Sequence, residues 1–229
     1  MTTKFGEVRA CVFDAYGTLF DIASATRGCR DLLGDDDIDK LTSLWRDKQL
    51  QYTWLRAIQD RHTDFWQVTG DALDFALDTL KLDQRGLRDR LMELYLTLDA
   101  FSEVPDVLRR LKAAGIRTSI LSNGSPIMLT SAVNHACLGD LIDCVLSVEE
   151  VGVYKPHPRV YQLAVDRLGI QASQISFQSS NAWDAYAASS FGMKVVWCNR
   201  YQQRVERLPG QPDCEIESLV ELPEIVGAI

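Results

Sequence analysis

The sequence predicts an α/β protein built on a doubly wound parallel sheet, with a helical insertion between its first strand and the others. Three observations predict this fold. Residues 8–13 form an apolar run that ends at Asp14, and Gly17 breaks the pattern soon after, as is typical of a buried strand entering a loop. Apolar residues between 22 and 98 recur at helical spacing, and beyond residue 104 helical and strand patterns alternate. Such alternation favours parallel strands with helices on both faces.

The helical insertion, residues 21–99, contains three groups of apolar residues at the spacing of an amphipathic helix. These are Leu41, Leu44, Trp45, Tyr52 and Leu55; Leu73, Ala76, Leu77 and Leu80; and Leu87, Leu91, Leu94, Tyr95 and Leu98. Each group places its apolar side chains on one face of a helix. We therefore expect the insertion to be entirely helical.

In the rest of the chain, segments with the apolar spacing of a helix alternate with short apolar runs typical of strands. A helix over 105–114 has Pro105 at its start and Gly115 at its end, which is the usual asymmetry of helix ends. Strands are expected at 116–121, 144–148, 175–178 and 194–198, and helices near 126–137, 159–168 and 182–191. The predicted organisation is a Rossmann-like core of residues 1–20 and 100–229, with residues 21–99 as a second domain.

Composition restricts the partners. The chain of 229 residues has 24 basic and 32 acidic side chains and a net charge of −8, which argues against binding to nucleic acid or to an anionic membrane surface. No window is apolar enough to span a membrane, and the first ten residues lack the apolar stretch of a secretory signal. We expect a cytoplasmic protein with a small-molecule partner.

The cysteines do not indicate a metal site. There are six, none in a CxxC pair, and only three histidines accompany them. This pattern favours free thiols over a bound soft metal.

Polar residues follow four of the five predicted strands. They are Asp14 and Thr18; Ser122 and Asn123; Lys155; and Ser179, Ser180, Asn181 and Asp184. Ligands of open parallel sheets bind beyond the carboxyl ends of the strands, so these side chains are expected to converge. Together they suit a carboxylate nucleophile with a charge partner and a base that activates water.

Each of these residues also has a purely structural interpretation. Asp14 and Asp184 suit helix caps, residues 122–125 suit a simple turn, and Lys155 suits a solvated loop. For a single residue the structural interpretation is the commoner one. It is weak for the whole set, because four strand ends would have to place polar groups at one edge by chance.

Four segments, in this order and spacing, resemble the haloacid dehalogenase superfamily and, within it, the L-2-haloacid dehalogenases. They are FDAYGTLFD (13–21), SNGSP (122–126), YKPHPRVY (154–161) and SSNAWDA (179–185). The resemblance extends over nearly the whole chain and includes LWRDKQLQYTWLR (44–56) in the helical insertion. It implies that the insertion is a cap domain over the sheet.

Two departures from the phosphatases of this superfamily bear on the reaction. Tyr16 stands where they have a second aspartate, and Ser179 and Ser180 precede the single Asp184 where they hold Mg²⁺ with acidic residues. Losing an acid and a metal ligand together points away from phosphoryl transfer. We expect no metal and no cofactor.

The resemblance implies hydrolysis of (S)-2-haloalkanoic acids to (R)-2-hydroxyalkanoic acids with inversion. Asp14 would attack the α-carbon from the face opposite the halogen, and water would then cleave the resulting ester. The partners would be the 2-haloacid substrate and the halide product. A metal-dependent phosphatase of the same superfamily is the alternative. A non-catalytic domain that binds a small anion is a third class, which the presence of Asp14, Lys155 and Asp184 disfavours.

The resemblance also implies a role for each site residue. Arg46, with Asn123, would accept the halide, and Ser122 and the backbone N–H groups of Ala15 and Tyr16 would hold the substrate carboxylate. Thr18 and Lys155 would orient Asp14 and keep it ionised, while Asp184, with Ser179, Ser180 and Asn181, would direct the water and Tyr161 would hydrogen-bond into this network. The residues that would line the site are Tyr16, Leu50, Phe65 and Trp183. For Arg46 the alternative is a surface charge, and for the aromatic and leucine residues it is ordinary core packing.

Two residues depart from the expected pattern. Asp47 follows Arg46, where it would either pair with the guanidinium and weaken its pull on an anion or point away on the helix surface. Gln178 occupies a strand position where an apolar residue is usual. We expect these residues to affect turnover rather than the kind of reaction.

Apolar residues of the helical insertion suggest an interface. Trp45, Tyr52, Trp54, Leu55 and Trp66 are more than one buried stripe needs, so some apolar surface is expected to stay exposed. Two-fold dimers are the commonest oligomers, which predicts a homodimer. The alternative is that these residues pack against the sheet domain and cover the site.

Overall fold

The computed structural model describes Phe5 and residues 7–228. Within these residues a six-stranded sheet has the order β3-β2-β1-β4-β5-β6, and every neighbouring pair is parallel. The strands are β1 Ala10–Phe13, β2 Arg117–Ser122, β3 Cys144–Ser147, β4 Ile175–Ser179, β5 Lys194–Cys198 and β6 Cys214–Ile216. The predicted α/β fold with a doubly wound parallel sheet is confirmed.

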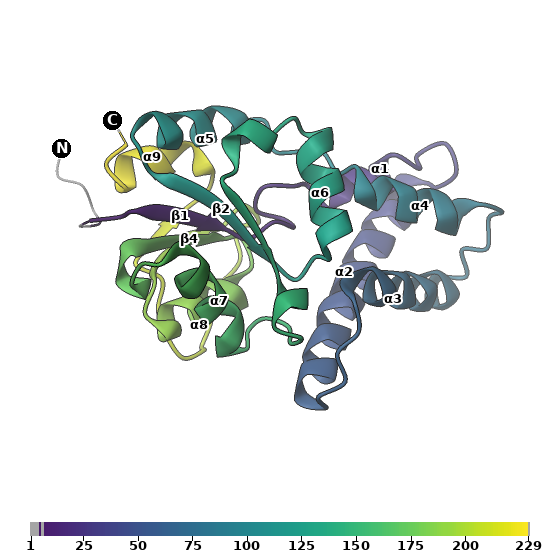
Figure 1. Cartoon of the computed structure of the whole chain (residues 1–229). Coiled ribbons are helices and arrows are strands. Elements are labelled where there is room, and N and C mark those ends of the chain that lie inside the picture. The colour runs from purple at the N-terminus through teal and green to yellow at the C-terminus, as the bar shows by residue number, and fades with distance from the viewer. Residues whose placement is uncertain (1–4, 6, 229) are drawn as a thin grey trace.

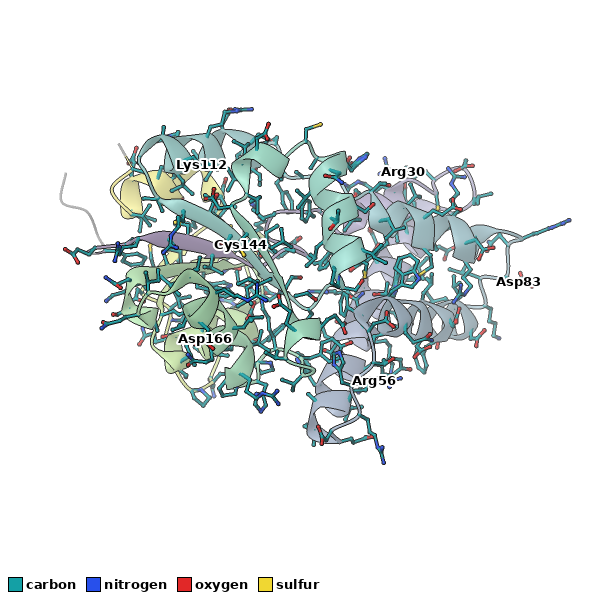
Figure 2. All side chains as sticks on the ribbon, viewed as in Figure 1. Arg30, Arg56, Asp83, Lys112, Cys144 and Asp166 are labelled. Atoms are coloured by element: carbon teal, nitrogen blue, oxygen red, sulfur yellow. The ribbon has the colours of Figure 1, made fainter. Side chains whose placement is uncertain are left out.

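Helices cover both faces of the sheet. They are α5 Val104–Ala113, α6 Pro126–His135, α7 Pro158–Leu168, α8 Ala182–Phe191 and α9 Leu222–Ile225. Figure 1 shows α5, α6 and α9 above the sheet and α7 and α8 below it. Lys112 of α5 and Asp166 of α7, both labelled in Figure 2, therefore lie on opposite sides of the molecule. Single 3₁₀ turns occur at Gly139–Leu141, Val148–Glu150, Ala172–Gln174 and Leu219–Glu221.

The helical insertion contains α1 Ala23–Arg27, α2 Asp35–Ile58, α3 Phe65–Leu80 and α4 Leu87–Leu96. Figure 1 shows these helices beside the sheet, at the end opposite the two termini. The side chain of Asp64 caps α3 by accepting from the N–H of Gln67 at 3.0 Å. The predicted all-helical character of this stretch is confirmed. The proposed division into two domains stays a prediction, and residues 1–4, 6 and 229 of the predicted core lie outside the described part of the chain.

The buried face of α2 differs in part from the predicted stripe. Its buried residues are Ile38, Leu41, Trp45, Gln49 and Thr53, whereas Leu44 and Tyr52 are half-buried and Leu55 is 44% exposed. The helix buries two polar side chains because each finds a hydrogen-bond partner inside the insertion. An apolar period alone does not reveal such residues.

The sixth strand was not predicted. β6 has only three residues and follows an exposed segment, 201–211, which carries no clear periodic pattern. Such a short edge strand owes its structure to pairing with β5 rather than to its own sequence. The other strands lie within one or two residues of their predicted positions.

The order of the strands reverses around β1. The chain passes from β1 to β2 and β3 on one side, and β4, β5 and β6 continue on the other. Phe13 pairs with Ile120 of β2 and with Gln178 of β4, so the residue after β1 lies at the point where the two halves of the sheet diverge. Ligands of open α/β sheets bind at such a switch point. Asp14 occupies it.

In the described residues no helix is long and apolar enough to cross a lipid bilayer.

Candidate active site

Asp14 is held by three donors from three segments of the chain. Its Oδ1 accepts from Lys155 Nζ at 3.1 Å, and its Oδ2 accepts from Asn181 Nδ2 at 2.8 Å and from Thr18 Oγ1 at 3.2 Å. Its backbone N–H donates to the carbonyl of Gln178 at 2.8 Å. The side chain is 8% exposed, so its charge is held in a fixed orientation with little solvent around it. This is the arrangement expected of a positioned carboxylate nucleophile.

Lys155 joins the two acidic residues of the site. Its Nζ contacts Asp14 and, at 2.7 Å, Oδ2 of Asp184, and its side chain is 1% exposed. Burial alone would lower the pKa of Lys155, but the two carboxylates outweigh burial and raise this pKa above its ordinary value. Lys155 therefore stays protonated between Asp14 and Asp184.

Asp184 is completely buried and fully partnered. Its Oδ1 accepts from Tyr161 Oη at 2.7 Å, and its Oδ2 accepts from Ser179 Oγ at 3.1 Å as well as from Lys155. Burial raises the pKa of Asp184 and Lys155 opposes that effect, with a raised pKa as the result. Asp184 is thus a stronger base than a solvated aspartate. The ammonium group of Lys155 lies between it and Asp14.

The residues after β4 connect the network. Ser180 donates its backbone N–H to Thr18 Oγ1 at 2.8 Å, and Ser179 Oγ accepts the N–H of Asn181 at 3.2 Å. Because the Thr18 hydroxyl accepts here, its own hydrogen is available for Asp14. Ser180 contributes through its backbone, whereas Ser179 and Asn181 contribute through their side chains.

Arg46 reaches the site from the middle of α2. Its Nη2 donates to Asn181 Oδ1 at 3.1 Å, and the amide of Asn181 in turn contacts Asp14. Asp47 is exposed, and across residues 7–228 no ion pair joins it to Arg46. The structure therefore does not have the pairing of Asp47 with the guanidinium, although both residues line one cavity.

The residues after β2 approach the site from the other side. Ser122 Oγ accepts the N–H of Gly124 at 3.1 Å, and Asn123 Oδ1 accepts the N–H of Lys155 at 3.0 Å. A Cβ at position 124 would lie 2.8 Å from the Tyr16 ring, so only glycine allows this close approach. No hydrogen bond between Asn123 and Arg46 occurs in the described structure, where Arg46 contacts Asn181 instead. The joint role of Arg46 and Asn123 stays a prediction.

Aromatic side chains surround the nucleophile. The ring of Tyr16 lies 5.8 Å from that of Phe65 and 5.5 Å from that of Tyr95. Burial raises the pKa of Tyr16 well above its ordinary value, with smaller contributions from Tyr95 and Asp14. Ala15 and Tyr16 are both buried directly after Asp14. Tyr16 is therefore a neutral part of the wall.

A cavity of about 380 Å³ leads to Arg46 and Asn181 and is lined by Leu50 and Trp183. A larger groove of about 980 Å³ lies on the other side of Trp183, between α2 and α7–α8, and is lined almost wholly by apolar groups. The charged network lies next to the smaller cavity. Because a substrate must bind close to the nucleophile and the hydrogen-bond donors in order to react, the smaller cavity is the candidate substrate site.

The structure thus joins most of the predicted catalytic and binding residues to one another at one edge of the sheet through direct hydrogen bonds or ring contacts. Ala15 takes part through its backbone, and Leu50 as lining. Ser122 instead bonds to Gly124, and the ring of Trp183 contacts Trp54. Sequence reasoning missed Gln49, Thr69 and Tyr95, which lie behind Arg46. Gln49 had a signal, because it is a polar residue within the buried stripe of α2.

Comparison with known proteins identifies the family. A model of haloacid dehalogenase-like hydrolases matches residues 8–192. The chain belongs to the haloacid dehalogenase-like hydrolases. The protein called (S)-2-haloacid dehalogenase 1 from Pseudomonas sp. (strain CBS-3) is a relative with 44% identity over 221 residues, covering 96% of each chain.

Solved structures of dehalogenases share the fold of this hydrolase. A dehalogenase determined with an intermediate complex has a TM-score of 0.93 and 42% identity, covering 96% of this chain and 97% of its own. The L-2-haloacid dehalogenase from Xanthobacter autotrophicus with chloropropionic acid covalently bound has a TM-score of 0.88 and 36% identity, covering 96% and 98%. The resemblance of the four segments to dehalogenases is confirmed.

The site does not fit the Mg²⁺ ion that phosphatases of this superfamily use. The two carboxylates that face each other, Asp14 and Asp184, both accept from Lys155, whose ammonium group lies between them. Position 16 offers a neutral phenol in place of a carboxylate. A divalent cation needs several oxygen ligands, and here the ammonium already takes the place between the acids.

Proposed function

We propose that this hydrolase converts (S)-2-haloalkanoic acids to (R)-2-hydroxyalkanoic acids through an ester on Asp14. The observation that carries the proposal is the chain of contacts from Arg46 through Asn181 to Asp14, which puts a nucleophile and a guanidinium on opposite sides of one amide. The relatives with this name and the covalent chloropropionic acid adduct of the Xanthobacter enzyme support it.

In the first step, a carboxylate oxygen of Asp14 attacks the α-carbon of the substrate. A carbon–oxygen bond forms while the carbon–halogen bond breaks, and the halide leaves with the electron pair. Attack from the face opposite the halogen inverts the configuration. Lys155, Thr18 and Asn181 hold the carboxylate in place, so that little reorganisation is needed to reach the reacting geometry.

In the second step, water attacks the carboxyl carbon of Asp14 and gives a proton to Asp184. The bond between that carbon and the ester oxygen breaks, and the departing alkoxide takes up the proton from Asp184. The new carboxyl group of Asp14 releases the second proton of the water to solvent, which restores the carboxylate. The product keeps the oxygen that came from Asp14, so the configuration set in the first step is preserved. The raised pKa of Asp184, which burial causes, suits it to act as this base.

Arg46 is the group we assign to the departing halide, because a fixed cation stabilises charge that grows only in the transition state. Ser122 and the backbone N–H groups of Ala15 and Tyr16 are assigned to the substrate carboxylate. The walls formed by Tyr16, Phe65, Leu50 and Trp183 would contact the alkyl group. Small monoanionic substrates of this kind need no metal to neutralise them.

The proposal is tested by halide release from both hands of 2-chloropropionate, with p-nitrophenyl phosphate and Mg²⁺ as the phosphatase assay. We expect chloride from the (S) form, none from the (R) form, and (R)-lactate as the product. Phosphate release without chloride release would favour the phosphatase alternative.

We predict that EDTA leaves the rate of chloride release unchanged, because Lys155 takes the place of a cation between Asp14 and Asp184. Initial rates with and without EDTA, and with added Mg²⁺, measure this directly. A loss of activity that Mg²⁺ restores would contradict the metal-independent mechanism.

We also propose that the protein is cytoplasmic and forms a homodimer. The dimer is supported by the exposure of apolar side chains on α2 and α3, where Leu55 is 44%, Ile58 82% and Phe75 38% exposed. Trp45, by contrast, is buried within the helical insertion and does not contribute to this surface. We predict that light scattering after gel filtration returns twice 25.8 kDa at micromolar concentration. A mass of one chain would contradict the dimer.

A further inference from the structure

A buried polar network lies directly behind Arg46, inside the helical insertion. Gln49 follows Arg46 by one turn of α2 and is 1% exposed. Its neighbours in the buried stripe, Leu41 and Trp45, are apolar. A buried glutamine costs free energy unless its amide is fully hydrogen-bonded, so its partners decide what it does.

Two hydrogen bonds in series fix the orientation of the Gln49 amide. Its Nε2 donates to Thr69 Oγ1 at 2.8 Å, and the Thr69 hydroxyl donates its own hydrogen to the carbonyl of Phe65 at 2.6 Å. The Thr69 oxygen must therefore accept, and only the NH₂ end of the amide supplies a donor. The other end, Oε1, consequently faces Arg46.

Gln49 Oε1 accepts from two groups. Arg46 Nη1 donates at 2.8 Å and Tyr95 Oη at 3.2 Å. Burial raises the pKa of the Tyr95 phenol, and the smaller effects of Arg46 and Gln49 do not reverse this, so the phenol stays protonated and donates. A reversed amide would set two N–H groups against the guanidinium.

Arg46 is thus held by two neutral oxygens. One belongs to Gln49 and the other to Asn181, and among the described residues no carboxylate lies within ion-pair distance of Arg46. A carboxylate in either place would orient the guanidinium equally well but would cancel its charge. A neutral acceptor orients the group and leaves its charge for another anion.

We propose that Gln49 is a positioning residue for halide acceptance, which aims the Arg46 guanidinium at the reacting site while leaving its positive charge unneutralised. Thr69 and Tyr95 set the Gln49 amide, and Gln49 sets Arg46. The inference rests on the proposed function in taking a halide as the anion that Arg46 receives. It explains why a glutamine follows Leu41 and Trp45 in the buried stripe of α2.

Two variants separate charge from orientation. Gln49→Glu keeps the shape and an acceptor for Arg46, but it adds a negative charge and replaces the donor to Thr69 by an acceptor. We expect kcat for (S)-2-chloropropionate to fall on the order of 10²-fold with KM nearly unchanged. We expect inhibition by added bromide to weaken about tenfold or more, because the neutralised guanidinium attracts the anion less. Gln49→Met removes the acceptor but leaves the charge, so kcat should fall about tenfold while bromide still inhibits.

Gln51→Glu is the matched control. Gln51 is exposed on the same helix and accepts from Lys48, so the same change there should leave kcat and bromide inhibition as in the wild type. Thermal unfolding verifies that each variant is folded.

Wild-type bromide inhibition in a folded Gln49→Glu variant would overturn the inference, as would equal loss of bromide inhibition in the Glu and Met variants. If Gln49→Glu does not fold, a wild-type kcat in Gln49→Met would overturn it. A wild-type enzyme that releases no chloride from either hand of the substrate would instead overturn the proposed function.

Discussion

Replacing Asp14 by asparagine is expected to reduce halide release on the order of 10⁴-fold or more, because an amide is a poor nucleophile and no ester can form. The substitution keeps the size of the side chain, and Thr18 and Lys155 remain to pack around it. Chloride release from (S)-2-chloropropionate, measured on freshly purified protein, is the assay.

Mass spectrometry gives a second measure of the same variant. After brief exposure to substrate and acid quenching, the wild type should carry a mass increase on the peptide that contains Asp14, and Asp14→Asn should not. Asp83→Asn, on the exposed turn between α3 and α4, is the control and should retain both turnover and the adduct. Wild-type turnover in Asp14→Asn would contradict the covalent mechanism.

Replacing Arg46 by alanine should lower kcat on the order of 10²-fold or more, because it removes a donor whose contribution grows as the halide departs. Since Asp47 is exposed and unpaired with Arg46 among the described residues, the guanidinium is not already neutralised from that side. The rate should also become more sensitive to the leaving group, with chloride affected more than bromide. Steady-state kinetics on both substrates measures this.

Arg56→Ala is the matched control for Arg46. Arg56 lies on the same helix, forms an ion pair with Asp71 at 3.3 Å, and is labelled in Figure 2 near the outer end of α2, away from the sheet. This partly solvated ion pair contributes little, so kcat should stay within a few-fold of the wild type. An equal loss in both variants would mean that Arg46 acts through the stability of the insertion rather than on the halide.

Part of the site followed from the sequence because of how parallel sheets are built. Asp14, Lys155 and Asp184 come from segments far apart in the chain, but each lies near the carboxyl end of a strand, and such ends meet at one edge. Apolar periods located those strands, since burial on both faces makes them continuous apolar runs. The nature of the charged groups, and hence the kind of chemistry, could therefore be predicted from local patterns.

The contact between the insertion and the sheet could not be predicted in this way. Arg46 meets Asn181 across 135 positions of the sequence, and nothing in the period of α2 says which of its polar residues faces the sheet. A helical period gives the buried side of a helix but not what it is buried against. The resemblance of 44–56 to dehalogenases pointed to Arg46, and the structure supplied its partner.

The sequence by itself determined the α/β class, the helical nature of the insertion and the acidic, basic and hydroxyl groups of the site, because these depend on the local alternation of apolar and polar residues. Only the tertiary structure decided the position of β6, the orientation of the Gln49 amide and the contact of Arg46 with Asn181. These features depend on which donors and acceptors meet when distant elements pack. A buried polar group is stabilised by whichever partner the packing brings to it, and the residues next to it in the sequence do not reveal that partner.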